Sequence, residues 1–223
     1  MEEPRDASAP AVEPPSSAAA AAVPAAAPER ATWRRHVALF GVVAALIAVD
    51  LWSKSAVFGA LDPVLNPDAA VEYGTSERNH PRIPVLGEWL GFMLNLNYGA
   101  AFGQGSGSQG ILVGGRILAA LFLAFLIVRT PKGQPVQLAA LVLVLAGALG
   151  NLYDNLYFEP HPGLPGFLEG RSYGPVRDFI DVYFAPWDWH FWTFNVADSC
   201  ISVGAVLLIA AGLFGGAARS APA

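Results

Sequence analysis

Four polar residues lie within the first turns of a long apolar run, and one of them is an aspartate. The run covers residues 191–214, about the length needed to cross the hydrocarbon core of a bilayer. The spacing of Asn195, Asp198, Ser199 and Ser202 places them on one face of a helix. Because a carboxylate inside a membrane is costly unless it faces protein or water, Asp198 is a candidate functional residue.

Two carboxylates that share a proton can hydrolyse a peptide bond without a metal or a nucleophilic side chain. One takes a proton from water, and the other gives a proton to the carbonyl oxygen and later to the leaving amine. Asp198 is a candidate for one member of such a pair. Asp154, Asp178 and Asp181 are candidates for the other member, and spacing alone does not choose among them.

The composition indicates a membrane protein. The chain is 54% hydrophobic and 14% charged, against about 25% charged residues in typical soluble domains. It carries no basic stripe, so we expect no nucleic-acid partner. Cys200 is the single cysteine, and the four histidines form no HExxH pattern. We therefore expect neither a metal nor another cofactor.

Four spans are predicted, at residues 37–58, 111–128, 136–158 and 191–214. Basic residues flank the ends that meet on one side, and the positive-inside rule makes that side cytoplasmic, with both termini there. They are Arg30, Arg34, Arg35, Arg129, Lys132 and Arg219. The Ala/Pro-rich segment 1–32 is predicted to be a disordered cytoplasmic tail, and 218–223 a second tail. Loops 59–110 and 159–190 are then extracytoplasmic.

This topology gathers the polar residues of the spans at the depth of the outer leaflet. The group comprises Asp50, Lys54, Arg116, Asn151, Asp154, Asn195 and Asp198. Each has a structural alternative to a role in catalysis. Asp50 and Lys54 are four residues apart, which favours a structural ion pair. Arg116 could anchor lipid headgroups or a loop, and Asn151 with Asp154 could form interhelical hydrogen bonds.

The two predicted outer loops differ in pattern. Residues 88–97 alternate as a strand does, which predicts a small sheet on the membrane surface. Gly99 and the two alanines after it allow the close approach of another chain. The second loop is rich in Gly and Pro over residues 159–175 and is predicted to be irregular there; Asp181 and Asp188 further along are possible solvated residues. His190, Trp187, Trp189 and Trp192 are expected to form an interfacial aromatic belt.

Five sequence blocks resemble those of the bacterial lipoprotein signal peptidases, the signal peptidase II family, and occur in the family's order. They are DLWSK at 50–54, NYGAAFG at 97–103, GALGNLYDN at 147–155, VRDFIDVYF at 176–184 and FNVADSCISVG at 194–204. The resemblance implies an all-α membrane protein with four transmembrane helices, a small extracytoplasmic β-sheet and a second extracytoplasmic loop. It places the peptidase domain at 33–217.

The resemblance also implies the site residues. The family's catalytic aspartates fall on Asp178 and Asp198. The supporting polar positions fall on Asp50, Lys54, Asn97, Asn151, Asp154 and Asn195, to which we add Gly99 and Arg116 as candidate support. The implied substrate is a diacylglyceryl-modified prolipoprotein, cut just before its lipidated cysteine. We expect a monomer in the bacterial cytoplasmic (inner) membrane, in contact with lipid, with its active site towards the outer leaflet.

The chain departs from the family pattern at two places. Asn155 stands where the family usually has an arginine, and the Gly/Pro-rich segment 159–174 resembles an insertion over the predicted entrance. Two other readings stay open: a small transporter or proton-relay protein, and an inactive relative that binds lipoprotein precursors. A transporter would carry polar residues through the full depth of its helices or internal repeats. Here the cytoplasmic halves are almost purely apolar.

Overall fold

The computed structural model describes residues 33–69, 81–99, 109–187 and 189–215. Four helices in these ranges are long and apolar enough to cross a membrane, as predicted. They are α1 (Trp33–Leu61), α3 (Gln109–Arg129), α4 (Pro135–Tyr157) and α5 (Val196–Gly215). The two predicted tails and the alanines after Gly99 lie outside the described residues.

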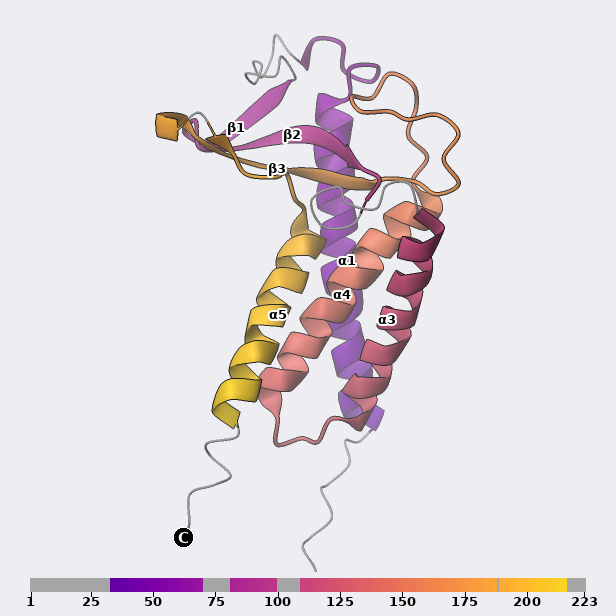
Figure 1. The fold of residues 1–223 in the computed structure, drawn as a ribbon, viewed down its shortest axis with the longest axis vertical. Helices are drawn as coiled ribbons and strands as arrows, with labels where there is room; N and C mark the ends of the chain where they lie inside the picture. Colours follow the sequence, from indigo (N-terminus) through magenta and orange to yellow (C-terminus); the bar gives the residue numbers. More distant parts are fainter. Residues whose placement is uncertain (1–32, 70–80, 100–108, 188, 216–223) are drawn as a thin grey trace, which may run out of the picture.

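The helices form a bundle with a small sheet at one end, which we call the sheet end (Figure 1). The start of α1, the turn between α3 and α4 and the end of α5 lie at the opposite end, which we call the turn end (Figure 1). At the turn end, the Arg35 guanidinium donates to the carbonyl oxygen of Pro131 at 3.3 Å. The arrangement of spans expected from the sequence is therefore present.

The most buried of the four spans is α4, which contacts the other three. Small residues allow its closest approaches. A Cβ added at Gly150 would meet Asp50 Oδ2 of α1 at 2.6 Å, and one at Gly204 of α5 would meet the carbonyl oxygen of Ala140 at 2.8 Å. Large apolar side chains of α1 and α3 point outward, as expected for helices in lipid; Trp52 and Leu118 are examples. The bundle therefore closes around α4.

The sheet has four antiparallel strands in the order β1–β2–β3–β4. They are β1 (Arg82–Leu86), β2 (Leu90–Asn97), β3 (Val176–Phe184) and β4 (Trp189–His190). The strand predicted at 88–97 is β2. In the register between β2 and β3, Asn95 faces Asp178 and Asn97 faces Val176. The sheet thus joins segments from both loops, although the sequence indicated strands only in the first.

The second loop was predicted to be irregular over residues 159–175, and no strand was predicted for residues 176–184, which form β3. Residues 176–179 and 181 of β3 are all buried, so the strand lacks the alternation of polar and apolar residues that sequence reading relies on. The fourth span also begins later than predicted, at Val196 rather than at residue 191. The aromatic residues before Val196, which were predicted to begin the span, lie beside β3 instead. There the Phe194 N–H donates to Ile180 O at 3.1 Å.

Two apolar clusters stabilise the molecule. One lies between the sheet and the end of α1, and its buried residues include Phe58, Leu61, Leu96 and Phe179. The other fills the bundle towards the turn end, around Leu141 and Leu145 of α4. The polar residues lie between these clusters, at the sheet ends of the helices.

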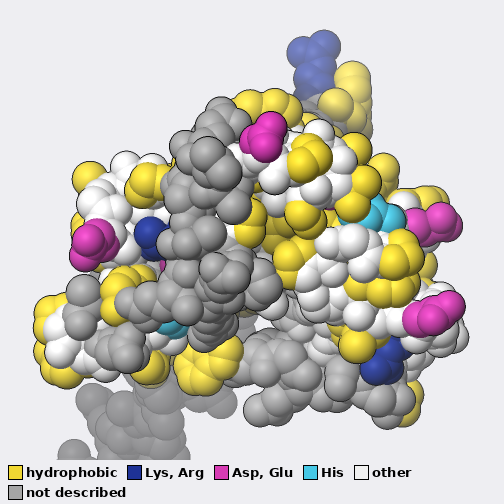
Figure 2. All heavy atoms as spheres, turned by 90° about the horizontal axis from the view of Figure 1, so that it is seen from above, with side chains coloured by type: hydrophobic (Ala, Val, Ile, Leu, Met, Phe, Trp, Pro, Cys, Tyr) yellow, Lys and Arg dark blue, Asp and Glu magenta, His cyan; other side chains and the backbone are white. Residues whose placement is uncertain are grey.

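The three tryptophans of the expected aromatic belt are exposed. Trp187, Trp189 and Trp192 are 75%, 46% and 55% exposed, and Figure 2 shows hydrophobic side chains with few charged groups between them on the face seen from the sheet end. His190 was expected in the same belt, but it is turned inward. Its ring stacks on Tyr183 with the centroids 4.5 Å apart. Of the four residues expected in the belt, the three tryptophans are therefore the exposed ones.

Candidate active site

Asn195 caps the N-terminus of α5 and is fully buried. Its Oδ1 accepts the backbone N–H of Asp198 at 2.9 Å, while its own backbone N–H donates to Asp198 Oδ2 at 3.3 Å. This reciprocal arrangement is that of a capping box. It holds the carboxylate of Asp198 in the first turn of the helix, where the helix dipole favours negative charge.

Asp178 lies on β3 and is 1% exposed. Two amide side chains donate to its carboxylate: Asn97 of β2 to Oδ2 at 3.0 Å and Asn195 to Oδ1 at 2.7 Å. The same Asn195 therefore binds Asp178 through its side chain and Asp198 through its backbone. A loop-borne and a helix-borne carboxylate thus share one asparagine.

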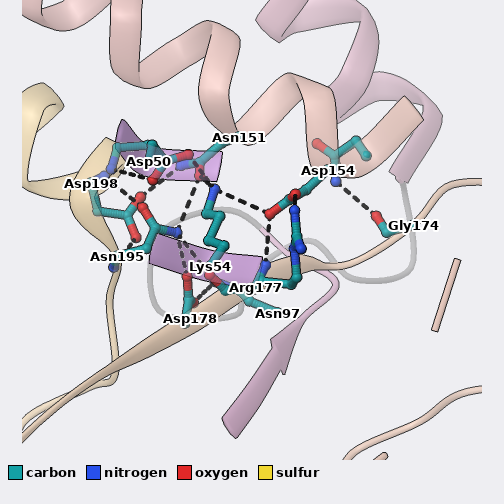
Figure 3. Close-up of polar contacts among 12 residues, drawn as sticks. Asp50, Lys54, Asn97, Asn151, Asp154, Gly174, Arg177, Asp178, Asn195 and Asp198 are labelled. Atoms are coloured by element: carbon teal, nitrogen blue, oxygen red, sulfur yellow. Dashed lines mark hydrogen bonds and ion pairs between the residues drawn. The ribbon is translucent and has the colours of Figure 1, made fainter. Parts of the chain in front are cut away.

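Asn151 of α4 completes this set of amides. Its Nδ2 donates to Asp198 Oδ1 at 2.7 Å, and its Oδ1 accepts from Asn195 Nδ2 at 3.1 Å. Figure 3 shows Asp178 and Asp198 on either side of Asn195. All the side chains that donate to the two carboxylates, within the ranges described above, are neutral amides. We refer to Asp178 and Asp198 as the aspartate pair.

A second group of carboxylates lies beside the pair and is bound by cations. Lys54 is completely buried, and its Nζ lies 2.8 Å from Asp50 Oδ2 and 3.1 Å from Asp154 Oδ2. It also donates to Asn151 Oδ1 at 3.0 Å. The ion pair predicted between Asp50 and Lys54 is therefore present, but it extends from α1 to α4. Asp50 Oδ1 also accepts the backbone N–H of Ala197 at 2.8 Å, which ties α1 to the start of α5.

Arg177 precedes Asp178 and binds Asp154 from β3. Its Nη2 and Nε donate to Asp154 Oδ1 at 2.7 and 3.1 Å, and its backbone N–H donates to Oδ2 at 3.0 Å. Its guanidinium also lies 4.6 Å from the centre of the Phe158 ring. Sequence analysis missed this residue, although a single cation inside an apolar block next to Asp178 was a usable signal. Asp50, Lys54, Asp154 and Arg177 form what we call the salt-bridge cluster.

The structure distinguishes the three aspartates that spacing left open as partners of Asp198. Asp154 is bound by Lys54 and Arg177. Asp181 is bound by Arg82 Nε at 2.8 Å and by His190 Nδ1 at 2.9 Å. Of the three, only Asp178 shares a partner with Asp198 in the described contacts: Asn195 donates to Asp178 through its side chain and to Asp198 through its backbone N–H. The alternative that Asp181 is a solvated loop residue is wrong, because it is 1% exposed within β3, and Asp188 lies outside the described residues.

The remaining candidates, Arg116 and Gly99, lie together next to Asn97. The guanidinium of Arg116 donates to Asn155 Oδ1 and, at 3.4 Å, to the carbonyl oxygen of Gly99. The backbone N–H of Gly99 donates to Asn97 Oδ1 at 3.0 Å. The described contacts of Arg116 are therefore those of the loop-anchoring alternative. Asn155 also donates to Gly174 O at 2.8 Å, a contact that the sequence did not indicate.

The segment 159–174 lies next to this group. Together with Tyr98, Asn155 and Pro175, this segment lines a cavity of about 390 Å³. Its attachment includes a 2.6 Å contact between His161 Nε2 and Asp62 Oδ2, just after α1. A Cβ at Gly174 would come within 2.7 Å of the carbonyl oxygen of Asp154, so the chain can pass α4 here only with glycine. The predicted insertion is therefore fixed beside the site.

The surroundings of Asp178 favour its protonated form. Burial raises the pKa of Asp178 well above its usual value, and the negative charge of Asp198 raises it further. Hydrogen bonds from Asn97 and Asn195 and the charge of Lys54 oppose this rise without cancelling it. Such a pair can supply one carboxylate as a base and one carboxylic acid as a proton donor. No group of three His, Cys, Asp or Glu side chains in the described ranges is arranged to hold a metal ion.

The fold and the site define a four-span membrane protein with a pair of carboxylates, of which Asp178 is buried and Asp198 is partly buried. A sequence model of the signal peptidase (SPase) II family matches residues 42–214, so the chain belongs to this family. The class of function expected from the sequence, a peptidase that acts on signal peptides, is thereby confirmed, and the alternatives are not favoured.

Individual relatives agree with this assignment. The chain is 35% identical to a lipoprotein signal peptidase of Streptomyces coelicolor over 185 residues, which cover 82% of this chain and 74% of the relative. It is 41% identical to one of Coxiella burnetii over 134 residues, covering 58% and 71%. A solved bacterial membrane enzyme shares the fold with a TM-score of 0.60, at 21% identity, over 88% of this chain and 98% of its own.

Proposed function

We propose that this protein is an aspartic endopeptidase that removes the signal peptide from diacylglyceryl-modified prolipoproteins, cutting just before the lipidated cysteine. Asp178 and Asp198 are its catalytic residues. The observation that carries this proposal is that these two carboxylates are bound by neutral groups and share Asn195, whereas Asp154 and Asp181 are bound by cations.

In this proposal the pair holds one proton at neutral pH. The ionised carboxylate accepts a proton from a water molecule, whose oxygen attacks the carbonyl carbon of the scissile bond. The protonated carboxyl gives its proton to the carbonyl oxygen, forming a tetrahedral intermediate. When the C–N bond breaks, a proton passes to the leaving amine and the pair returns to one shared proton.

The position of the pair suits a substrate anchored in lipid. We propose that the sheet end faces the extracytoplasmic side, because Arg34, Arg35, Arg129 and Lys132 all lie at the turn end. The diacylglyceryl chains can then remain in the outer leaflet while the signal helix lies among the spans. The sheet covers the pair, and β2 lies where it can hold the extended segment around the scissile bond.

The experiment replaces each member of the pair with asparagine and follows the processing of a lipidated precursor. We expect Asp178→Asn and Asp198→Asn each to lower the cleavage rate by at least about a thousandfold, because neither acid nor base can be replaced by an amide. Asp181→Asn, on the same strand as Asp178, is the matched control and should retain cleavage. Normal processing by either pair variant, once membrane insertion is verified, would end the assignment.

Chelation separates this mechanism from a metal-dependent one. We expect EDTA to leave the cleavage rate unchanged, because the proposed acid and base are both side chains of the protein. A loss of activity with EDTA that added zinc restores would instead require a metal as the source of the nucleophile.

A further inference from the structure

Arg116 is a partly buried cation near the aspartate pair, and no carboxylate among the described residues accepts its hydrogen bonds. Its two acceptors are the side-chain oxygen of Asn155 and the carbonyl oxygen of Gly99. The other cations at the sheet ends of the helices behave differently, because Lys54 and Arg177 both bind aspartates directly. The guanidinium of Arg116 nevertheless lies within electrostatic range of Asp198, Asp178 and Asp154, in that order of strength.

Among the described residues, the formal charges of the site balance when Arg116 is counted. The salt-bridge cluster contains two aspartates and two cations, so it is neutral by itself. The aspartate pair with one shared proton retains one negative charge. A buried charge without a counter-charge is strongly unfavourable. Arg116 is the cation placed to supply it.

We infer that Arg116 is a positioning residue of the peptidase site, whose guanidinium balances the single negative charge that Asp178 and Asp198 retain while they share a proton. Asn155 and Gly99 hold this guanidinium on the side of the pair next to β2. Gly99 is linked in turn to Asn97, which donates to Asp178. The inference rests on the proposed function, because it assumes that the pair performs the chemistry.

This role also explains Asn155. Members of the family usually carry an arginine at this position, and here an asparagine accepts a hydrogen bond from an arginine on the neighbouring helix. Here a guanidinium next to this position comes from α3. An asparagine fits because its amide binds Arg116 through Oδ1 and the Gly174 carbonyl through Nδ2.

Other charged groups face the pair from every element packed against it, and the test must leave them unchanged. They are Asp50 and Lys54 of α1, Asp154 of α4 and Arg177 of β3. The pH dependence of cleavage reports the charge around the pair, whereas a purely structural role of Arg116 would change only the amount of folded protein. The readout is therefore the pH profile of kcat/KM, measured together with the melting temperature.

The experiment uses the full-length protein in detergent micelles and a diacylglyceryl-modified prolipoprotein peptide as substrate. The variants are Arg116→Ala, Arg116→Lys, and the double variant Arg116→Ala with Asn155→Arg. Arg129→Ala is the matched control, because Arg129 lies at the turn end of the same helix, where its guanidinium packs over Phe125. All four variants are compared with the wild type over the same pH range.

Loss of a nearby cation makes a carboxylate harder to ionise. We therefore expect Arg116→Ala to move the pH profile upward by about one unit and to lower kcat/KM at the wild-type optimum about tenfold. Arg116→Lys retains the charge and should keep the wild-type position of the profile. The double variant should recover most of both losses, and Arg129→Ala should match the wild type.

Two results would overturn the inference. One is an Arg116→Ala profile at the wild-type pH, whatever its amplitude, since the cation would then not affect the pair. The other is a double variant that folds but shows the same displaced profile as Arg116→Ala. Either result, obtained while Asp178→Asn and Asp198→Asn remain inactive, would refute the role of Arg116 alone. Cleavage by the aspartate variants would refute the proposed function itself.

Discussion

Two groups of carboxylates lie side by side in this protein, and they are bound in opposite ways. Asp50 and Asp154 are bound by Lys54 and Arg177, and these ion pairs join α1, α4 and β3. Asp178 and Asp198 receive hydrogen bonds only from neutral side chains and backbone groups within the described residues. The first arrangement stabilises a fold and cannot exchange protons readily. The second leaves a charge that a shared proton must relieve.

The difference explains how the aspartate pair can exist inside a mainly apolar bundle. The salt-bridge cluster fixes the segments on which the pair is carried. Asp154 binds the backbone N–H and the side chain of Arg177, the residue before Asp178. Asp50 binds the N–H of Ala197, the residue before Asp198. Each member of the pair is therefore held in place through its neighbour in the chain. Its own carboxylate accepts no hydrogen bond from a cation among the described residues.

The largest effect should come from breaking the salt-bridge cluster. We expect Lys54→Met to lower the free energy of unfolding by about 3–5 kcal/mol, because Asp50 and Asp154 would remain buried without their shared cation. Thermal unfolding in detergent measures this, with Lys132→Met, an exposed change at the turn end, as the control. Equal stability of Lys54→Met and wild type would show that the cluster does not hold the fold together.

A smaller effect is expected from the amide that joins the pair. Asn195→Ala removes the N-cap of α5 and the hydrogen bonds that its side chain donates to Asp178 and Asn151. We expect a loss of about 2 kcal/mol in unfolding free energy, together with a marked loss of cleavage. Asn66→Ala, outside the site, provides a control for the loss of a partly buried asparagine. Retained cleavage by Asn195→Ala would mean that the shared amide does not position the pair.

The pair itself should show an unusual pH dependence of stability. The pKa of Asp178 is raised in the folded protein. Its contribution to the free energy of unfolding is therefore fully present below pH about 4 and is lost as the pH rises through the raised pKa. Asp178→Asn cannot ionise, so its melting temperature relative to wild type should increase with pH. A difference that is constant or falls with pH would contradict the shared proton.

The smallest effect concerns the insertion, outside both groups. Burial would raise the pKa of Asp62, but hydrogen bonds from His161 and two backbone N–H groups outweigh it and lower that pKa. This contribution is present above pH about 4 and is lost as the pH falls. His161→Ala should reduce stability by less than about 1 kcal/mol, because the ring is 38% exposed. A larger loss would mean that this contact supports the fold.

The sequence predicted the features that depend on local pattern. The four spans follow from long apolar runs, and β2 follows from the alternation around Phe92 and Leu96. The ion pair of Asp50 and Lys54 follows from their four-residue spacing. The sequence also predicted that the polar residues of the spans gather at one depth, because an alternating topology brings those helix ends together. The structure has them at the sheet ends of the helices (Figure 1). The identity of the catalytic pair came from the family resemblance, and it stays a proposal.

The features that were missed depend on contacts between distant segments. Strand β3 is buried on both faces, so no alternation marks it, and its pairing with β2 joins residues about 80 positions apart. Arg177 became visible as a ligand of Asp154 only in three dimensions. The link between Arg116 and Asn155 likewise joins two helices. No spacing along the chain encodes which partner a buried aspartate will meet.

The central claim is that Asp178 and Asp198 share one proton. Infrared spectroscopy of the protein with isotope-labelled aspartate, in a detergent without ester groups, tests it at neutral pH. The account predicts a carboxylic-acid band that disappears in Asp178→Asn and in Asp198→Asn but persists in Asp181→Asn. A wild-type spectrum with carboxylate bands only, or an acid band that survives both pair substitutions, would contradict it.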